Sequence, residues 1–218
     1  MDDFGAVWYN PAAIGTKGVA KEKRRSVGRD KILEAAESLF REHSFSSVSL
    51  ADVARAVDIR KPSIYYHFPN GKEELFVAVQ RGMFLRIGDE LKRAMAEAEA
   101  DLASQLSAAS RWFLSRPPLF LLSMVHNDMP DLSEAHRKEL SRISYEAIML
   151  PLVEAARSAA ERGELRDIEP HRIAGSFLAL LEGNTITARA GFAGDLETLM
   201  HGSIDIILNG VLSSRRDV

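Results

Sequence analysis

Hydrophobic residues recur at steps of three and four positions along most of this sequence, which is the spacing of one apolar helix face. Between about residues 29 and 43, for example, Ile32, Ala36 and Leu39 repeat in this way. The same pattern predicts further helices over about 50–57, 61–68, 72–100, 102–115, 117–127, 132–162, 170–191 and 194–213. No stretch of useful length alternates hydrophobic and polar residues as a half-buried strand does, so we predict an all-α fold.

Capping and helix-breaking residues mark the limits of the second and third helices. Ser49, followed three residues later by Asp52, predicts a capping box at the start of the second helix. Asp58 occupies the turn after that helix, and Pro62 is acceptable only in the first turn of the next one. The run 69–71, Pro-Asn-Gly, then stops a third helix that is barely two turns long.

Three short amphipathic helices with a tight turn between the last two describe a helix-turn-helix unit, whose third helix reads DNA. We expect Ile59, Ile64 and Phe68 to anchor that helix in the core. Its outer surface then carries Lys61, Ser63, Tyr65, Tyr66 and His67. A phenol hydroxyl can donate to a phosphate oxygen while its ring contacts sugar or a thymine methyl. The alternative interpretation is that the tyrosines complete a small core and that Lys61 is an ordinary surface lysine.

Composition narrows the possibilities without deciding among them. Hydrophobic residues make up 46% of the 218 positions, enough for a sizeable core, and the absence of cysteine excludes disulfides and thiolate metal sites. Residues 1–81 carry 13 Lys and Arg against 11 Asp and Glu, whereas the remainder carries 15 against 20. The N-terminal third is therefore the better partner for a polyanion.

Membrane, secretory and enzymatic functions find no support in the sequence. No apolar run is long enough to span a bilayer, and the first residues lack the continuous apolar stretch of a signal peptide, so we expect a cytoplasmic protein. The motifs HExxH and GxSxG, paired Cys/His ligands and a phosphate-binding glycine loop are all missing. We therefore predict no enzyme activity, no cofactor and no metal.

The stretch from Ile32 to Val79 resembles the DNA-binding domain of the TetR family, of the TetR/AcrR type, from end to end. The most specific blocks are AAESLF, then SLADVARAVDI, then PSIYYHF followed by KEEL. We expect residues 1–28 to be a flexible N-terminal extension with a basic end. The resemblance implies a three-helix DNA-binding domain over 29–75 and a larger helical domain for ligand sensing and dimerisation over 76–218. The basic cluster at 21–25 is either a solvated tail or an arm that touches phosphate.

Members of that family are homodimers, and most are repressors that a small molecule releases from a palindromic DNA operator. Carried over by position, the DNA-contacting residues are Ser49, Lys61, Pro62, Ser63, Tyr65, Tyr66, His67 and Lys72. Tyr65 and Lys72 are expected to bind phosphate. Ser49 would cap the second helix at the DNA backbone.

This sequence departs from the family pattern at a few positions. Ser44 and Asp58 stand where glycine is usual, Ala51 stands where many members have arginine, and Gly71 is an extra residue before the lysine. Aspartate tolerates a left-handed turn better than most residues, so Asp58 is compatible with the fold. Its negative charge and the missing arginine are both expected to weaken DNA binding.

The second half supplies candidates for a ligand pocket and a dimer interface. Bulky residues of the middle helices are proposed to line the pocket: Phe84, Trp112, Phe113, Phe120, Met124, Tyr145, Met149 and Phe177. The stretch 162–183 resembles the turn and penultimate helix of many family members. The last two helices are expected to form a four-helix interface in the dimer through Phe177, Leu181, Ile204 and Leu208. Pro151 is expected to kink or break the helix that contains it.

Two other functions remain open from the sequence. A helical small-molecule-binding protein that has lost DNA binding would explain Ala51 and Asp58. An activator of the same family has no distinguishing feature in the sequence, because promoter geometry separates activators from repressors.

Overall fold

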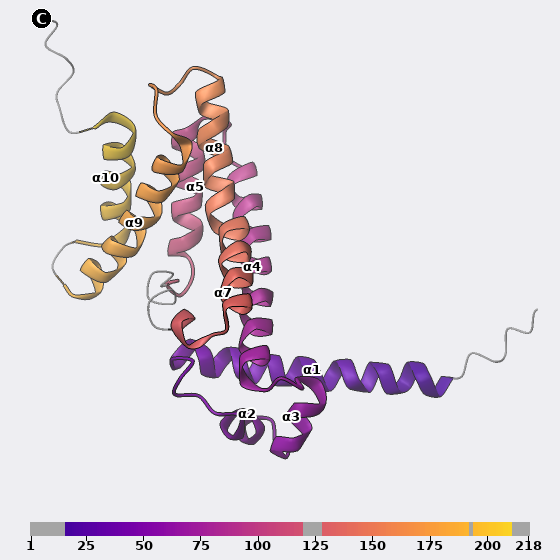
Figure 1. Cartoon of the computed structure of the whole chain (residues 1–218). Helices are drawn as coiled ribbons and strands as arrows, with labels where there is room; N and C mark the ends of the chain where they lie inside the picture. Colours follow the sequence, from indigo (N-terminus) through magenta and orange to yellow (C-terminus); the bar gives the residue numbers. More distant parts are fainter. Residues whose placement is uncertain (1–15, 120–127, 192–193, 211–218) are drawn as a thin grey trace, which may run out of the picture. The chain divides into compact units, whose positions relative to one another are not determined.

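The helices follow the predicted order closely. The computed structural model describes residues 16–119, 128–191 and 194–210, with side chains from residue 28 onward. Its elements are α1 (Thr16–Glu42), α2 (Leu50–Ala56), α3 (Lys61–His67), α4 (Lys72–Ala96), α5 (Leu102–Leu114), a 3-10 turn η2 (Met129–Asp131), α7 (Glu134–Ser144), a π-helical turn η3 (Tyr145–Met149), α8 (Leu150–Glu161), α9 (Pro170–Arg189) and α10 (Leu196–Asn209) (Figure 1). Within these ranges there is no strand, so the described part of the chain is all-α. Most of the helix predicted over 117–127 lies outside the described residues.

The first helix begins much earlier than its hydrophobic pattern suggested. We predicted a flexible extension up to residue 28, but α1 already begins at Thr16. The residues at 20–25 are Ala, Lys, Glu, Lys, Arg and Arg, all of which have high helix propensity. Because they lack an apolar face, periodicity gave no sign of them. The backbone of the basic cluster is therefore helical.

The chain divides into two compact units, and the division falls within α4 between Val79 and Gln80. The core of the smaller unit is built from Ile32, Ala36, Val48, Leu50, Val53, Ala54, Ile64, Phe68, Leu75 and Val79. Beside it, the Phe76 ring packs against the rings of Phe40 and Phe45, with centroids 5.0 and 4.9 Å away. This core fixes the two seven-residue helices α2 and α3, which are too short to be stable alone.

The larger unit is a bundle formed by most of α4 and by α5 to α10. In it, α8 packs against α9, α9 packs against α10, and α10 and α8 both contact α5. Figure 1 shows that α8, α9 and α10 run in alternating directions. Fully buried side chains at the centre include Phe84, Leu91, Leu106, Leu152 and Phe177.

Pro151 is accommodated by a π-helical turn, and the helix is not broken. Proline has no N–H, so the backbone hydrogen-bond ladder must change ahead of it. The chain makes that change in η3 and continues directly into α8. Here α4 comes very close, because a Cβ added to Gly88 would lie 3.0 Å from the Ala147 Cα. Gly88, which weakens α4 as a helix, is thus required for close packing against the π turn.

Candidate nucleic-acid interface

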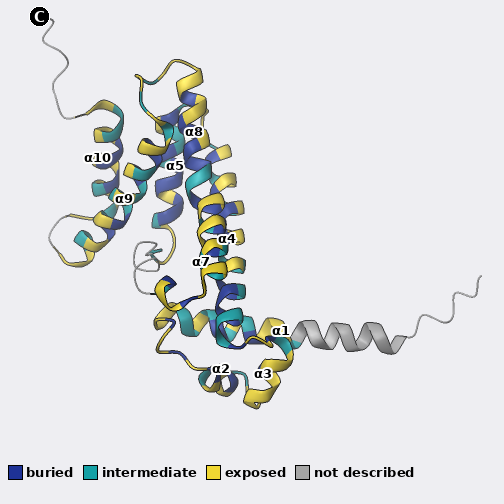
Figure 2. Ribbon diagram, viewed as in Figure 1, coloured by how far each residue is buried: buried dark blue, intermediate teal, exposed yellow. Residues whose placement is uncertain are grey.

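Helix α3 turns one face into the core and leaves the other in solvent. Ile64 and the following Phe68 are completely buried, whereas Tyr65 and Tyr66 keep 44% and 55% of their surface exposed. Lys61, Pro62 and Ser63 are also exposed. Figure 2 shows α3 largely in the colour of exposed residues. The interpretation of the tyrosines as core residues is therefore wrong. Two adjacent exposed phenols are available to a partner.

Ser49 and Asp52 form the predicted capping box at the start of α2. The Asp52 backbone N–H donates to Ser49 Oγ at 3.2 Å, and the Ser49 N–H donates to Asp52 Oδ2 at 3.0 Å. The Ser49 hydroxyl itself donates to Asp52 Oδ2 at 2.6 Å, and these bonds to Ser49 hold the pKa of Asp52 below its ordinary value. The Ser49 hydroxyl must therefore rotate away from Asp52 before it can donate to a DNA phosphate.

The turn between α2 and α3 is left-handed at Asp58, whose φ is 52°. After it, the Ile59 N–H donates to the carbonyl of Ala54 at 3.0 Å and closes the end of α2. Aspartate thus adopts the conformation that glycine usually supplies at this point, as the sequence analysis expected. Because aspartate replaces the usual glycine, an exposed carboxylate lies just before α3.

Lys72, the expected phosphate ligand at the start of α4, is held against the loop before α2. Its Nζ lies 3.3 Å from the carbonyl oxygen of Ser46 and 4.2 Å from the centre of the Phe45 ring. The ammonium is half-buried and positioned by these contacts. This arrangement was not predictable from the sequence, because Phe45 and Ser46 are far from Lys72 in the chain.

His67 and Arg29 connect α3 to α1. His67 is half-buried, and a Cβ added to Gly28 would lie 3.3 Å from its Nε2. The guanidinium of Arg29 lies 5.0 Å from the centre of the Phe68 ring. His67 thus packs against α1 and is less available to a partner than the two tyrosines.

Sequence reasoning overlooked Arg60. It is exposed and immediately precedes α3, next to the exposed Lys61. Arg55 is exposed as well, but its guanidinium pairs with Asp52 at 3.1 Å. Arg60 and Lys61 are therefore two adjacent exposed cations at the start of the helix that carries the tyrosines. Arg60 could have been identified from the sequence, because it lies two residues before Pro62, the first-turn proline of α3.

Comparison with known proteins agrees with this geometry. The family model described as bacterial regulatory proteins, tetR family, matches residues 32–79, which contain α2 and α3 entirely. ComR of Escherichia coli K12, an HTH-type transcriptional repressor, is 29% identical over 202 residues that cover 87% of this chain and 92% of ComR. Residues 32–79 therefore form a domain of the kind found in bacterial regulatory proteins of the tetR family.

Other similar proteins match either a short segment or most of the chain. IcaR of Staphylococcus epidermidis, the negative transcriptional regulator of the biofilm operon icaADBC, is 42% identical over 48 residues, which are 22% of this chain and only 25% of IcaR. FadR of Bacillus subtilis, solved in complex with stearoyl-CoA, superposes with a TM-score of 0.66 at 13% identity and covers 84% of this chain and 98% of FadR. The chain therefore resembles IcaR over a short segment of its sequence and FadR in its fold.

The expected ligand-pocket residues mostly lie in the core of the larger unit. Phe84, Trp112, Phe113 and Phe177 are buried there, and Met149 packs against them. Tyr145 is 39% exposed, and its hydroxyl lies 2.9 Å from His171 Nε2. Phe120 and Met124 are outside the described residues. None of this set lines the clefts beside α7, beside α2, at the end of α5 or between α4 and α8, so its role in ligand binding stays a prediction.

Two of the four residues expected at the dimer interface are buried in the core of the single chain. Phe177 and Ile204 are buried within the single chain, so they cannot form the surface of an interface. Leu181 and Leu208 are half-buried. The exposed apolar side chains on the same two helices are Ile186, with 54% of its surface accessible, and Ile206, with 51%. Both faces of α9 are rich in apolar residues, so its sequence alone did not distinguish the inner face from the outer one.

Metal binding and membrane insertion find no support in the described part of the chain. No three His, Cys, Asp or Glu side chains gather there in a way that could hold a metal ion. No helix within it is sufficiently long and apolar to cross a bilayer.

Proposed function

We propose that this protein is a ligand-responsive repressor of the tetR family that binds a palindromic operator as a homodimer. The observation that carries the proposal is the exposed face of α3, where Tyr65 and Tyr66 point into solvent beside Lys61 and Ser63. A helix of this length fits the major groove, and its short exposed face presents side chains for both phosphates and base edges.

Residues on this face divide into two classes of contact. Tyr65 and Lys72 bind phosphate, which fixes the position of the protein on DNA without reading sequence. Lys61 and Ser63 at the start of α3 approach base edges. Arg60, exposed just before α3, adds a further phosphate contact. The contact of Ser49 with the DNA backbone requires its hydroxyl to leave Asp52.

Dimerisation is proposed to bring two copies of α3 onto successive major grooves. The exposed Ile186 on α9 and Ile206 on α10 belong to the surface that a second copy would cover, together with the half-buried Leu181 and Leu208. Burial of exposed apolar side chains drives association. Two half-sites about one turn of DNA apart, roughly 34 Å, define the spacing that ligand binding must disturb.

Repression is favoured over activation by similarity to named repressors. ComR is called a repressor and aligns with most of this chain, and IcaR is called a negative regulator. A ligand-responsive mechanism is consistent with FadR, a structural neighbour that was solved with stearoyl-CoA. We propose no enzymatic activity and place the protein in the cytoplasm with its operator.

The test is selection of binding sites from a randomised duplex pool by the full-length protein. An enriched palindrome supports a dimeric operator-binding regulator. No enrichment at low salt supports the second candidate function, a sensor that no longer reads DNA, which is motivated by the exposed carboxylate of Asp58 beside α3.

A double variant then tests the two classes of contact. Tyr65→Phe with Lys72→Ala should weaken binding to the selected site and to scrambled DNA alike, and should flatten the dependence of affinity on salt. Lys61→Ala should change which bases are preferred. Unchanged affinity in the double variant would remove Tyr65 and Lys72 from the phosphate contacts. Arg41→Ala is the matched control, because Arg41 is exposed at the end of α1 and pairs with Glu37 at 3.2 Å.

A further inference from the structure

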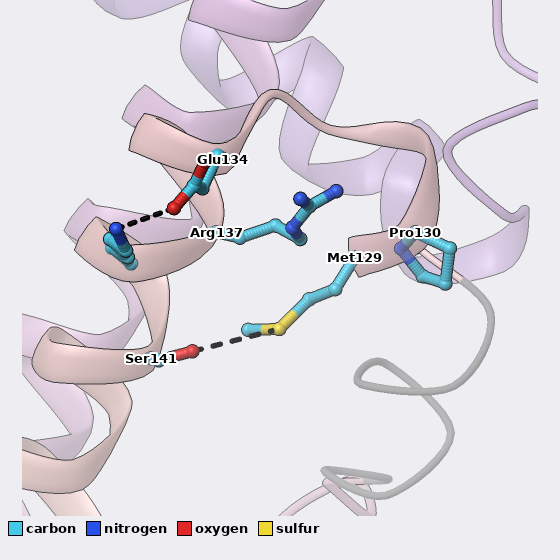
Figure 3. A pocket seen from close by; sticks show the side chains of 6 residues that line it. Met129, Pro130, Glu134, Arg137 and Ser141 are labelled. Atoms are coloured by element: carbon cyan, nitrogen blue, oxygen red, sulfur yellow. Dashed lines mark hydrogen bonds and ion pairs between the residues drawn. The ribbon is translucent and has the colours of Figure 1, made fainter.

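An open cleft of about 570 Å³ lies beside the first turns of α7, in the larger unit. It is lined by Met129, Pro130, Glu134, Arg137, Lys138 and Ser141. Figure 3 shows the Arg137 side chain extending from α7 toward Met129 and Pro130. Volumes of this order are typical of small-molecule sites. None of these residues belongs to the pocket expected from the sequence.

The charges around the cleft do not cancel. Lys138 pairs with Glu134 across one turn of α7 at 2.5 Å, so these two neutralise each other. Arg137 has no acidic partner among the described residues, and its Nη1 donates to the backbone carbonyl of Leu132 at 2.8 Å. One half-buried guanidinium is thus held in place by a neutral acceptor. It retains donors that no carboxylate of the described chain engages.

The opposite wall of the cleft is apolar. Met129 is buried and Pro130 is exposed, and the Met129 sulfur accepts a weak hydrogen bond from the Ser141 hydroxyl at 3.9 Å. A methionine side chain adapts its shape to apolar ligands. An arginine fork, in turn, matches the two oxygens of a carboxylate or a phosphate. The two walls therefore favour opposite ends of one molecule.

We propose that this cleft binds an amphipathic anion, with its carboxylate or phosphate group on Arg137 and its apolar part against Met129 and Pro130. The site takes the anion of a larger apolar compound in preference to a free inorganic ion, because one guanidinium is a weak anion site by itself. The role of this cleft as the effector site of a repressor rests on the proposed function. Binding of the anion to the cleft does not itself require DNA.

Calorimetric titration of the full-length protein without DNA tests the cleft. The probes are octanoate and octyl phosphate, kept below the concentrations at which they form micelles, with octanol and octyltrimethylammonium as neutral and cationic counterparts. We expect saturable binding of at least one anion and at least tenfold weaker binding of both counterparts. The stronger of the two anions identifies the head group. Equal binding of octanol and octanoate overturns the proposal.

Variants on α7 assign the binding to Arg137. Arg137→Gln should weaken anion binding at least tenfold, whereas Arg142→Gln should leave it unchanged. Arg142 lies on the same helix but is exposed and pairs with Glu146 at 2.9 Å. Because Arg137 also bonds to Leu132, a second variant leaves it intact: Pro130→Glu places a carboxylate beside the guanidinium and should compete with the ligand. Full anion affinity in both Arg137→Gln and Pro130→Glu overturns the assignment.

Release of DNA is measured separately, by fluorescence anisotropy of a labelled operator. Anion binding that depends on Arg137 but does not release DNA supports the cleft and refutes the effector role. DNA binding without any anion binding refutes the cleft and leaves the operator-binding function intact.

Discussion

The two units of this protein present their functional side chains in opposite ways. The smaller unit exposes Tyr65 and Tyr66 on the outside of a seven-residue helix, where only a partner with its own groove can surround them. The larger unit keeps Arg137 half-buried at an open cleft. An exposed helix face suits the groove of the proposed operator, whereas a cleft suits the proposed small ligand. Variants that perturb one unit at a time test how independently the two units fold.

The largest effect is expected from emptying one core at a time. Phe68 is fully buried in the smaller unit, and Phe68→Ala should cost about 3–5 kcal/mol there. DNA binding should be lost while the larger unit stays folded. Hydrogen–deuterium exchange resolved by mass spectrometry should show lost protection in α2 and α3 and retained protection in α8.

Phe177→Ala is the reciprocal variant, because Phe177 is fully buried in the core of the larger unit. It should reduce protection in α8 and α9 first. If either variant lowers the protection of both units equally, the two units unfold as one cooperative structure. The division within α4 then has no thermodynamic meaning.

A smaller effect is expected at the close contact between α4 and the π turn. Gly88→Ala places a Cβ 3.0 Å from the Ala147 backbone, and this overpacking should cost about 1–3 kcal/mol. Gly82→Ala on the same helix meets only the end of the Arg86 side chain at 3.5 Å, so it should gain up to about 1 kcal/mol from helix propensity. Thermal unfolding followed by circular dichroism measures both. Equal behaviour of the two alanine variants would show that the π turn yields without cost.

Local features of the fold could be predicted from the sequence, whereas contacts between distant residues such as Gly88 and Ala147 could not. Helix order and the capping box at Ser49 were predictable, because propensity, spacing and caps are local. The close packing of α4 against the π turn was not predictable, since Gly88 lies far from Ala147 in the chain. The contact of Lys72 with Phe45 and Ser46 was missed for the same reason.

The candidate functional residues show the same difference between local features and distant contacts. The face of α3 was predictable because a buried Ile64 and Phe68 leave their neighbours exposed on so short a helix. The outer face of α9 was not, because residues on both of its faces are apolar. The cleft at Arg137 depends on the carbonyl of Leu132 and on Met129, which no pattern of side chains in the sequence brings together.

Asp58 offers a still smaller effect, on DNA binding rather than on folding. Asp58→Asn keeps a residue that tolerates the left-handed φ of 52° but removes the charge. Affinity for DNA should rise about threefold at low salt, and the slope of log affinity against log salt should steepen. Anisotropy titrations at several salt concentrations measure both.

Asp58→Gly separates charge from backbone strain at the same position. It should match Asp58→Asn in DNA affinity, and it should change the free energy of unfolding by no more than about 1 kcal/mol. If only the glycine variant binds DNA more tightly, the conformation of the turn is responsible and the charge is not.

The smallest effect concerns pH and the start of α5. The Ser104 backbone N–H donates to the Asp101 carboxylate at 2.8 Å, and this bond holds the pKa of Asp101 below its ordinary value of 3.8. A carboxyl with a lowered folded-state pKa contributes stability above its unfolded value and loses it as pH falls through the folded one. Asp101→Asn keeps an acceptor for the same N–H but cannot titrate. Thermal midpoints measured from neutral pH into acid should therefore fall more steeply for the wild type than for Asp101→Asn, whereas Asp167→Asn, in the exposed loop between α8 and α9, should follow the wild type. Parallel curves for the wild type and Asp101→Asn would mean that this cap does not contribute to acid sensitivity. The stability of the larger unit would then depend on contacts within the bundle more than on this helix end.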